Sequence, residues 1–187
     1  MIISTFSDEL KLAFSQGRVF AYPTEAVFGL GCDPLNESAV LKLLKLKSRP
    51  LHKGLILIAS CQEQLAPFAD FTKLPEERRK EIDESWPGPN TWLVPKKSAT
   101  PDYLTGGSDL IAVRVSAHPV VRQLCDGLNS ALVSTSANVS GAEPARTQSD
   151  VLAQFSNTVL CVDGAVGTQN NPSQIRNALT GDVIRAG

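Results

Sequence analysis

The sequence predicts a single-domain α/β fold built on a twisted, largely buried mixed sheet with helices flanking it. Two observations carry this prediction. Short apolar runs alternate with segments of helical periodicity along the chain, and turns rather than long linkers separate them. The 187 residues, 42% of them hydrophobic, suffice for one well-buried core. We therefore expect one domain that spans residues 1–187.

Six segments have the apolar spacing of helices, and their ends carry helix signals. Ser7 and Asn36 are predicted N-caps, because their short side chains can accept a hydrogen bond from the first turn. Gly17 ends the first helix, and Pro50 ends the second by restricting the residue before it. The helices are expected over residues 7–17, 36–49, 61–69, 74–86, 118–128 and 147–155.

Seven apolar runs predict strands. The run "GLILIAS" is apolar without alternation, which is typical of a strand buried on both faces. The run "LIAVRVS" contains Arg114, a charged side chain between aliphatic neighbours that must reach solvent or find an anion. The strands are expected over residues 18–23, 54–60, 91–97, 110–116, 131–137, 158–163 and 182–187.

Charge and hydropathy argue against several classes of protein. The chain has 18 basic and 19 acidic residues, so its overall balance does not demand nucleic acid, although a local basic patch is compatible with it. The apolar stretches are far shorter than the ~20 residues needed to cross a bilayer, and the N-terminus lacks the pattern of a secretory signal. We expect a cytoplasmic protein with no membrane partner.

The cysteines and histidines do not have the spacing of a metal site. The four cysteines are far apart in the sequence, and neither histidine has a cysteine neighbour. We predict no metal site and no disulfide, and we interpret three of the cysteines as small buried hydrophobes in or beside strands. These residues are Cys32, Cys61, Cys125, Cys161, His52 and His118.

Polar side chains gather in loops at the ends of the predicted strands, where open α/β sheets bind ligands. In "YPTEAVFGLGCDP", Thr24 and Glu25 follow a strand, and Gly29 and Gly31 are predicted to let the backbone approach a ligand. An exposed loop charge is the alternative interpretation of Glu25. The turn "WPGP" indicates only a rigid bend.

Two other loops supply cations and short hydroxyl or amide groups. "LKSRPLHKG" gathers basic side chains and "STSANVSG" gathers serines and an asparagine. Each has a simpler explanation, a favourable helix dipole worth about 0.3–1 kcal/mol for the first and a cap or Asx turn for the second. Together they suit a phosphate-bearing ligand. The chain contains neither GxxxxGK[ST] nor GxGxxG, which argues against the standard nucleotide folds.

Seven segments resemble, in order, those of the YrdC/Sua5 family, and most closely its short bacterial branch. They are "YPTEAVFGLGCDP", "LKSRP", "KGLILIA", "WPGPNT", "AVRVSAHP", "STSANVSG" and "NPSQIRNALTG", and they extend from about residue 20 to the C-terminus. The resemblance implies an α/β fold around a large, basic concave cavity. It also implies a chain without the additional C-terminal domain of the longer branch.

The resemblance implies a nucleotidyltransferase that joins L-threonine, bicarbonate and ATP into L-threonylcarbamoyladenylate and releases pyrophosphate. This product feeds the t6A modification at position 37 of tRNAs that read codons starting with A. The expected partners are therefore the downstream proteins that transfer the threonylcarbamoyl group, together with tRNA or another structured RNA. Mg²⁺ is expected to arrive on the phosphates of ATP, because the sequence has no evident carboxylate cluster to cage it.

The resemblance also assigns residues to the two ends of the cavity. Glu25 is a further candidate, as a general base or as a supporting group. The residues expected to bind ATP and carry catalysis are Lys47, Arg49, Ser136 and Asn138, with Arg185 as a further ATP contact. The residues expected around threonine are Thr24, His52, Arg114, Ser134 and Ser173.

Two alternatives stay open at this point. A non-catalytic module could use the same basic cavity to bind tRNA or rRNA, and its affinity would then fall steeply with salt. ATP hydrolysis, or carbamoyl transfer to another amine, would share the same cavity and cannot be separated from the sequence.

Overall fold

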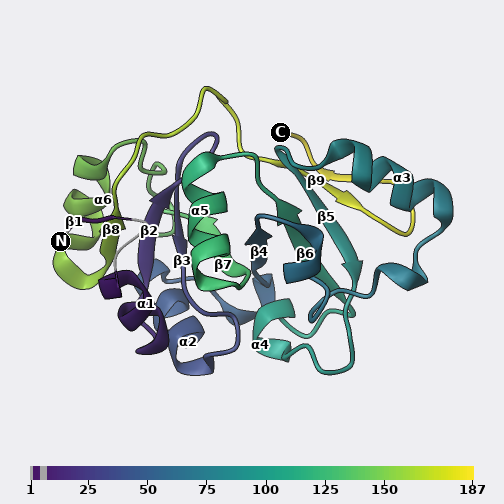
Figure 1. The fold of residues 1–187 in the computed structure, drawn as a ribbon, viewed down its shortest axis with the longest axis horizontal. Coiled ribbons are helices and arrows are strands. Elements are labelled where there is room, and N and C mark those ends of the chain that lie inside the picture. Colours follow the sequence, from purple (N-terminus) through teal and green to yellow (C-terminus); the bar gives the residue numbers. More distant parts are fainter. Residues whose placement is uncertain (1, 5–7) are drawn as a thin grey trace.

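A mixed sheet of ten strands forms the centre of the computed structural model, which describes residues 2–4 and 8–187 (Figure 1). The strand order is β1-β8-β2-β3-β7-β4-β6-β5-β9-β10, and parallel pairs (β1/β8, β2/β8, β4/β6, β5/β9) are mixed with antiparallel ones. The strands are β1 Ile2–Ile3, β2 Phe20–Pro23, β3 Phe28–Gly31, β4 Ile56–Ala59, β5 Asn90–Pro95, β6 Leu110–Val115, β7 Leu132–Ser136, β8 Leu160–Val162, β9 Gln174–Asn177 and β10 Val183–Arg185. The predicted mixed α/β sheet is confirmed.

Helices connect the strands and cover both faces of the sheet. The helices are α1 Asp8–Ser15, α2 Glu37–Lys47, α3 Glu76–Ser85, α4 Asp102–Thr105, α5 Pro119–Leu128 and α6 Gln148–Phe155, with short 3₁₀ turns η1 Leu51–Lys53, η2 Gln62–Gln64, η3 Phe71–Lys73 and η4 Ser156–Thr158. No helix among the described residues is long and apolar enough to cross a membrane.

The core has two parts, one on each face of the sheet, because alternate strand residues point to opposite faces. On one face, α1 and α5 pack against a cluster that includes Tyr22 and Ile58. On the other, α2 packs against a cluster that includes Leu30, Leu57 and Val133. The neighbours Leu57 and Ile58 thus belong to different clusters, which confirms that "GLILIAS" contains a strand buried on both faces.

Local signals predicted some helix ends correctly. Asn36 caps α2, because its side-chain oxygen accepts a hydrogen bond from the Ala39 N–H at 3.1 Å. Ser48 closes α2 in the left-handed conformation (φ 52°), two residues before Pro50. The predicted cap Ser7 lies outside the described residues.

Other elements differ from the prediction. The segment that follows β2 is not only a loop, because residues Phe28–Gly31 form β3. Residues 61–69 do not form a helix, and only the turn η2 falls within them. Sequence patterns missed further helices and strands as well as β3, and all of these elements are short: β1, α4 and β9. A strand of four residues such as β9 is too short to establish a period, so its neighbours in space decide it.

The register of the central strands determines which side chains reach the site. Ile56 of β4 lies opposite Ser134 of β7 on one side and Ala112 of β6 on the other. Ala112 in turn lies opposite Leu93 of β5. These four side chains therefore form one row across the sheet. The row lies on the same face as Ile58 and α5, two residues before Ile58 along β4.

Candidate active site

A cavity of about 480 Å³ opens over this row of side chains. Its floor comes from strands β3, β7, β4, β6, β5 and β9, and its rim includes the η1 turn and residues 171–173. The predicted residues that line it are Thr24, Glu25, Arg49, His52, Arg114, Ser134, Ser136, Ser173 and Arg185. Segments far apart in the sequence thus meet around one space, as expected for a binding site at strand ends.

Two glycines of "FGLG" have different roles. Gly29 lies opposite Ser136 and lines the cavity, in agreement with the prediction. Gly31 does not line it. A Cβ at Gly31 would lie 2.3 Å from the Val133 carbonyl oxygen and 2.7 Å from Cε1 of Tyr22. The prediction that Gly31 admits a ligand is therefore wrong, because its missing side chain makes room for the buried Tyr22 ring.

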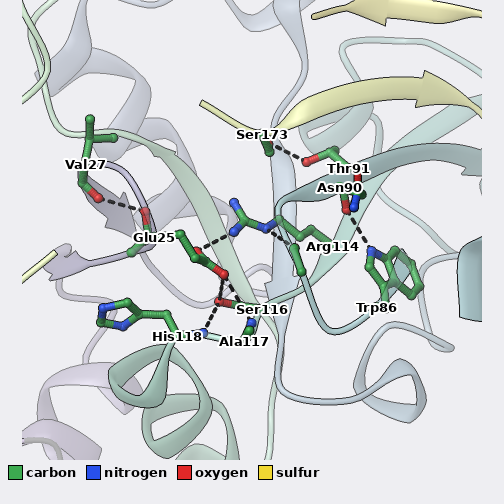
Figure 2. Close-up of polar contacts among 12 residues, drawn as sticks. Glu25, Val27, Trp86, Asn90, Thr91, Arg114, Ser116, Ala117, His118 and Ser173 are labelled. Carbon is green, nitrogen blue, oxygen red and sulfur yellow. Dashed lines mark hydrogen bonds and ion pairs between the residues drawn. The ribbon is translucent and has the colours of Figure 1, made fainter. Parts of the chain in front are cut away.

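Arg114 and Glu25 form a buried ion pair at the cavity wall (Figure 2). Arg114 is 8% exposed, and its Nε donates a hydrogen bond to the Gly88 carbonyl oxygen at 2.9 Å. Glu25 Oε1 accepts hydrogen bonds from Ser116 Oγ at 2.8 Å and from the Ala117 N–H at 3.1 Å. Arg114 in β6 was predicted to reach solvent or find an anion, and that anion is Glu25 of the same chain. The "WPGP" turn contributes the Gly88 carbonyl oxygen that Arg114 also bonds.

The environment of Glu25 keeps it ionised. Burial alone raises its pKa, but the Arg114 charge and the Ser116 hydrogen bond outweigh burial, so the pKa lies below its ordinary value. The Glu25 side chain is 13% exposed, so the exposed-charge interpretation is wrong. A carboxylate with a lowered pKa is a weak base, which favours a supporting role for Glu25 over proton abstraction.

Arg49 and Arg185 bring further positive charge to the cavity. Arg49 is anchored at the carbonyl oxygen of Gly54, at 3.2 Å from Nε and 3.0 Å from Nη2. Arg185 Nη2 donates to the Ser173 carbonyl oxygen at 2.7 Å. Burial and then the Arg185 charge lower the pKa of Arg49, and burial and then Arg114 lower the pKa of Arg185. The described residues that line the cavity thus include three guanidinium groups and one carboxylate, and only Arg114 is paired with that carboxylate.

Lys47 and Asn138 lie behind the cavity wall rather than at its surface. The buried Lys47 Nζ donates to the carbonyl oxygens of Ser136 and Asn138, the latter at 2.7 Å, and to Asn138 Oδ1 at 3.3 Å. Asn138 Oδ1 also accepts from Ser136 Oγ at 2.6 Å. The three protons of the ammonium group are thus matched by three oxygens of the β7 end. Contact of Lys47 and Asn138 with ATP stays a prediction.

The predicted threonine-end residues are held by different means. Thr24 Oγ1 donates to the Val27 carbonyl oxygen at 2.7 Å, which closes the turn between β2 and β3. Ser173 Oγ lies 2.8 Å from Oγ1 of Thr91, a fully buried hydroxyl on β5 (Figure 2). His52 is exposed on the η1 turn at the rim.

Several supporting groups escaped the sequence analysis. Ser116 donates a hydrogen bond to Glu25, and Thr91 shares one with Ser173. The Gly88 carbonyl oxygen accepts a hydrogen bond from Arg114. Serine and threonine in or beside strands carry no distinctive local pattern, and a backbone carbonyl carries none at all. Only the contacts across the sheet identify them.

Comparison with known proteins identifies the family. The model of the Sua5/YciO/YrdC family, described as telomere recombination, matches residues 13–187. The chain belongs to the Sua5/YciO/YrdC family. Similar family members include threonylcarbamoyl-AMP synthase of Pseudoalteromonas atlantica, 52% identical over 95% of each chain. The threonylcarbamoyl-AMP synthase of Yersinia enterocolitica is 53% identical over 98% of this chain and 96% of its own.

A solved structure of this family has the same fold. The crystal structure of Sua5 from P. abyssi complexed with L-threonine matches with a TM-score of 0.85 and 31% identity. The match covers 95% of this chain and 54% of Sua5, so this chain spans about half the length of that family member.

Proposed function

We propose that the chain is a threonylcarbamoyl-AMP synthase, an ATP-dependent adenylyl-transferring enzyme that uses L-threonine and bicarbonate. The observation that carries the proposal is the charge of the cavity. Arg49, Arg114 and Arg185 line it, and Glu25 neutralises only Arg114. Burial and then a neighbouring guanidinium charge lower the pKa of both Arg49 and Arg185, the neighbour being Arg185 for Arg49 and Arg114 for Arg185. An anion bound between them would offset this repulsion, and the triphosphate of ATP is such an anion. The names of the relatives support the same activity.

The chemistry suits a site without a covalent nucleophile. The amine of threonine adds to carbon dioxide derived from bicarbonate and loses a proton, which gives a carbamate. A carbamate oxygen then attacks the α-phosphorus of ATP in line, and the bond to pyrophosphate breaks. The protein's task in this sequence is to position the reactants and to stabilise the charge on the phosphates.

The residues divide between the two ends of the substrate pair. Arg49 and Arg185 contact the phosphates in this proposal, beside the hydroxyl of Ser136. Arg114 binds the threonine carboxylate with the N–H groups that Glu25 and Gly88 leave available, beside Thr24 and the other threonine-end residues of the wall. Lys47 and Asn138 keep the end of β7 in place below the reactants.

Mg²⁺ fits this site only as a companion of ATP. The single carboxylate among the described residues that line the cavity, Glu25, is already paired with Arg114. Proteins usually bind Mg²⁺ through one or two carboxylates together with substrate phosphates, and the described lining offers no carboxylate that is unpaired. We therefore assign no step to a metal held by the protein.

The product, threonylcarbamoyl-AMP, is a mixed anhydride that needs an acceptor. We propose that proteins of the t6A modification of tRNA consume it, which would place the enzyme in the cytoplasm. Direct contact with tRNA is a separate proposal. Its support is limited to two basic residue types at the rim, His52 and Lys53.

Pyrophosphate release tests the activity. The purified chain is incubated with ATP, Mg²⁺ and bicarbonate, with L-threonine or with serine or valine in its place. Release that requires both threonine and bicarbonate is expected, together with a product that contains the adenylate. Release without threonine would instead indicate ATP hydrolysis. No release, with salt-sensitive RNA binding, would indicate the RNA-binding module.

A further inference from the structure

We propose that His118 is a positioning residue that holds the segment over the threonine end of the cavity, an inference that rests on the proposed function. This segment, residues 163–173, connects β8 to β9 and is called the strap below. It passes along the upper edge of the molecule in Figure 1. His118 precedes α5, lies outside the cavity lining and is 7% exposed.

The strap lies directly on the loop that carries Thr24 and Glu25. The Gly167 N–H donates to the Thr24 carbonyl oxygen at 2.9 Å, and the Gln169 N–H donates to the Glu25 carbonyl oxygen at 3.0 Å. A Cβ at Gly167 would lie 2.8 Å from the Glu25 carbonyl oxygen. The absence of a side chain at Gly167 therefore permits this close backbone approach. Movement of the strap would displace both cavity residues.

His118 joins the strap to the ion pair from the other side. Its Nε2 lies 3.1 Å from the Ala165 carbonyl oxygen. A carbonyl oxygen only accepts, so Nε2 carries the proton in this contact. The His118 backbone N–H donates to Ser116 Oγ, which donates to Glu25 Oε1 (Figure 2). One residue thus links the strap to the group that orients Arg114.

The ring has no other polar anchor among the residues that the structure describes. Its Nδ1 is buried without a hydrogen-bond partner there. Burial is the main reason why the pKa of His118 lies below its ordinary value, so the ring is neutral at pH 7. A buried neutral ring with one hydrogen bond, made to the strap, fits a tether better than it fits an acid or base.

Substitutions separate the donor from the shape of the ring. His118→Phe keeps a planar ring but removes the Nε2 donor, whereas His118→Gln replaces that donor with an amide N–H. We expect His118→Phe to raise the KM for threonine about five- to tenfold, as the loss of one buried hydrogen bond predicts, with the KM for ATP within about twofold. His118→Gln should restore most of the affinity. Gly167→Ala should reproduce the effect of His118→Phe, and Arg122→Gln, on the exposed side of α5, is the matched control.

Hydrogen exchange tests the tether without activity. We expect the Gly167 and Gln169 amides to exchange at least about fivefold faster in His118→Phe than in the wild type or in Arg122→Gln. Unchanged exchange in a folded variant would overturn the proposal, whether or not the wild type makes the adenylate. Equal rises in the KM values for threonine and ATP would indicate a merely structural role and would also overturn the proposal. So would a fall in kcat alone, in proportion to the lost stability. Lack of pyrophosphate release by the wild type would refute only the proposed function.

Discussion

Arg49→Ala tests the assignment of the phosphate end most directly. Arg49 is half-buried, its Nε and Nη2 are fixed on the Gly54 carbonyl oxygen, and Arg185 adds a second positive charge nearby. A hydrogen bond between charged groups contributes about 1.5–3 kcal/mol. At 1.4 kcal/mol per factor of ten, its loss should weaken ATP binding about 10- to 150-fold. The KM for threonine should stay within about threefold.

The matched variant Arg49→Lys keeps the charge and loses the fork that bonds Gly54. It should fall between the wild type and Arg49→Ala in ATP affinity. Calorimetric titration with ATP measures the affinity, and pyrophosphate release at varied ATP and threonine separates the two KM values. Thermal unfolding of both variants checks that the fold survives. A folded Arg49→Ala protein with ATP affinity within threefold of the wild type would refute the reasoning.

Three further predictions follow from buried contacts. Glu25→Gln leaves Arg114 buried without its anion, so chemical denaturation should show that the unfolding free energy falls by about 3–5 kcal/mol. The KM for threonine should also rise more than the KM for ATP. An unchanged unfolding free energy would contradict the ion pair. Burial and then the Arg49 charge lower the pKa of Lys47 to about 8, so between about pH 8 and 10.5 the native state has lost a proton that the unfolded chain keeps. The unfolding free energy of the wild type should therefore rise relative to that of Lys47→Met over this range, and parallel pH profiles would exclude the shift. Gly31→Ala should cost about 2–3 kcal/mol of stability, because the new Cβ meets the Val133 carbonyl oxygen, and a neutral effect in thermal unfolding would show that β3 can shift.

Local patterns predicted the parts of the fold that depend on neighbours in the sequence. The cap at Asn36 needs only a side-chain oxygen three residues before its donor. The buried strand in "GLILIAS" needs only an uninterrupted apolar run. Residues 61–69 contain apolar side chains too, but they form only the short η2 turn. Pro67 lies inside this segment, and a proline in a helix interior removes a backbone N–H and disfavours a helical conformation at the residue before it. Leu65 and Phe68 pack into the core from the irregular segment instead.

The candidate site was predicted as a set of residues but not as a geometry. The resemblance placed Arg114 at the threonine end, and the structure adds that Glu25, 89 positions earlier, already pairs with it. The resemblance assigned Lys47 to ATP, and in the structure its ammonium group donates hydrogen bonds to oxygens at the end of β7. The partners of Arg114 and Lys47 are far away in the sequence, so no local pattern predicts them.

The sequence by itself determined the α/β class, the helix ends that close on adjacent residues and the types of side chain available for an anionic ligand. Periodicity and capping depend on residues a few positions apart, so they can be recognised in the sequence itself. Only the tertiary structure decided that β3 joins the sheet, that Gly31 leaves room for the Tyr22 ring, and that His118 bonds the strap. These contacts depend on strand register and on burial. Both are established only when distant segments pack together, and each buried polar group then finds its partner.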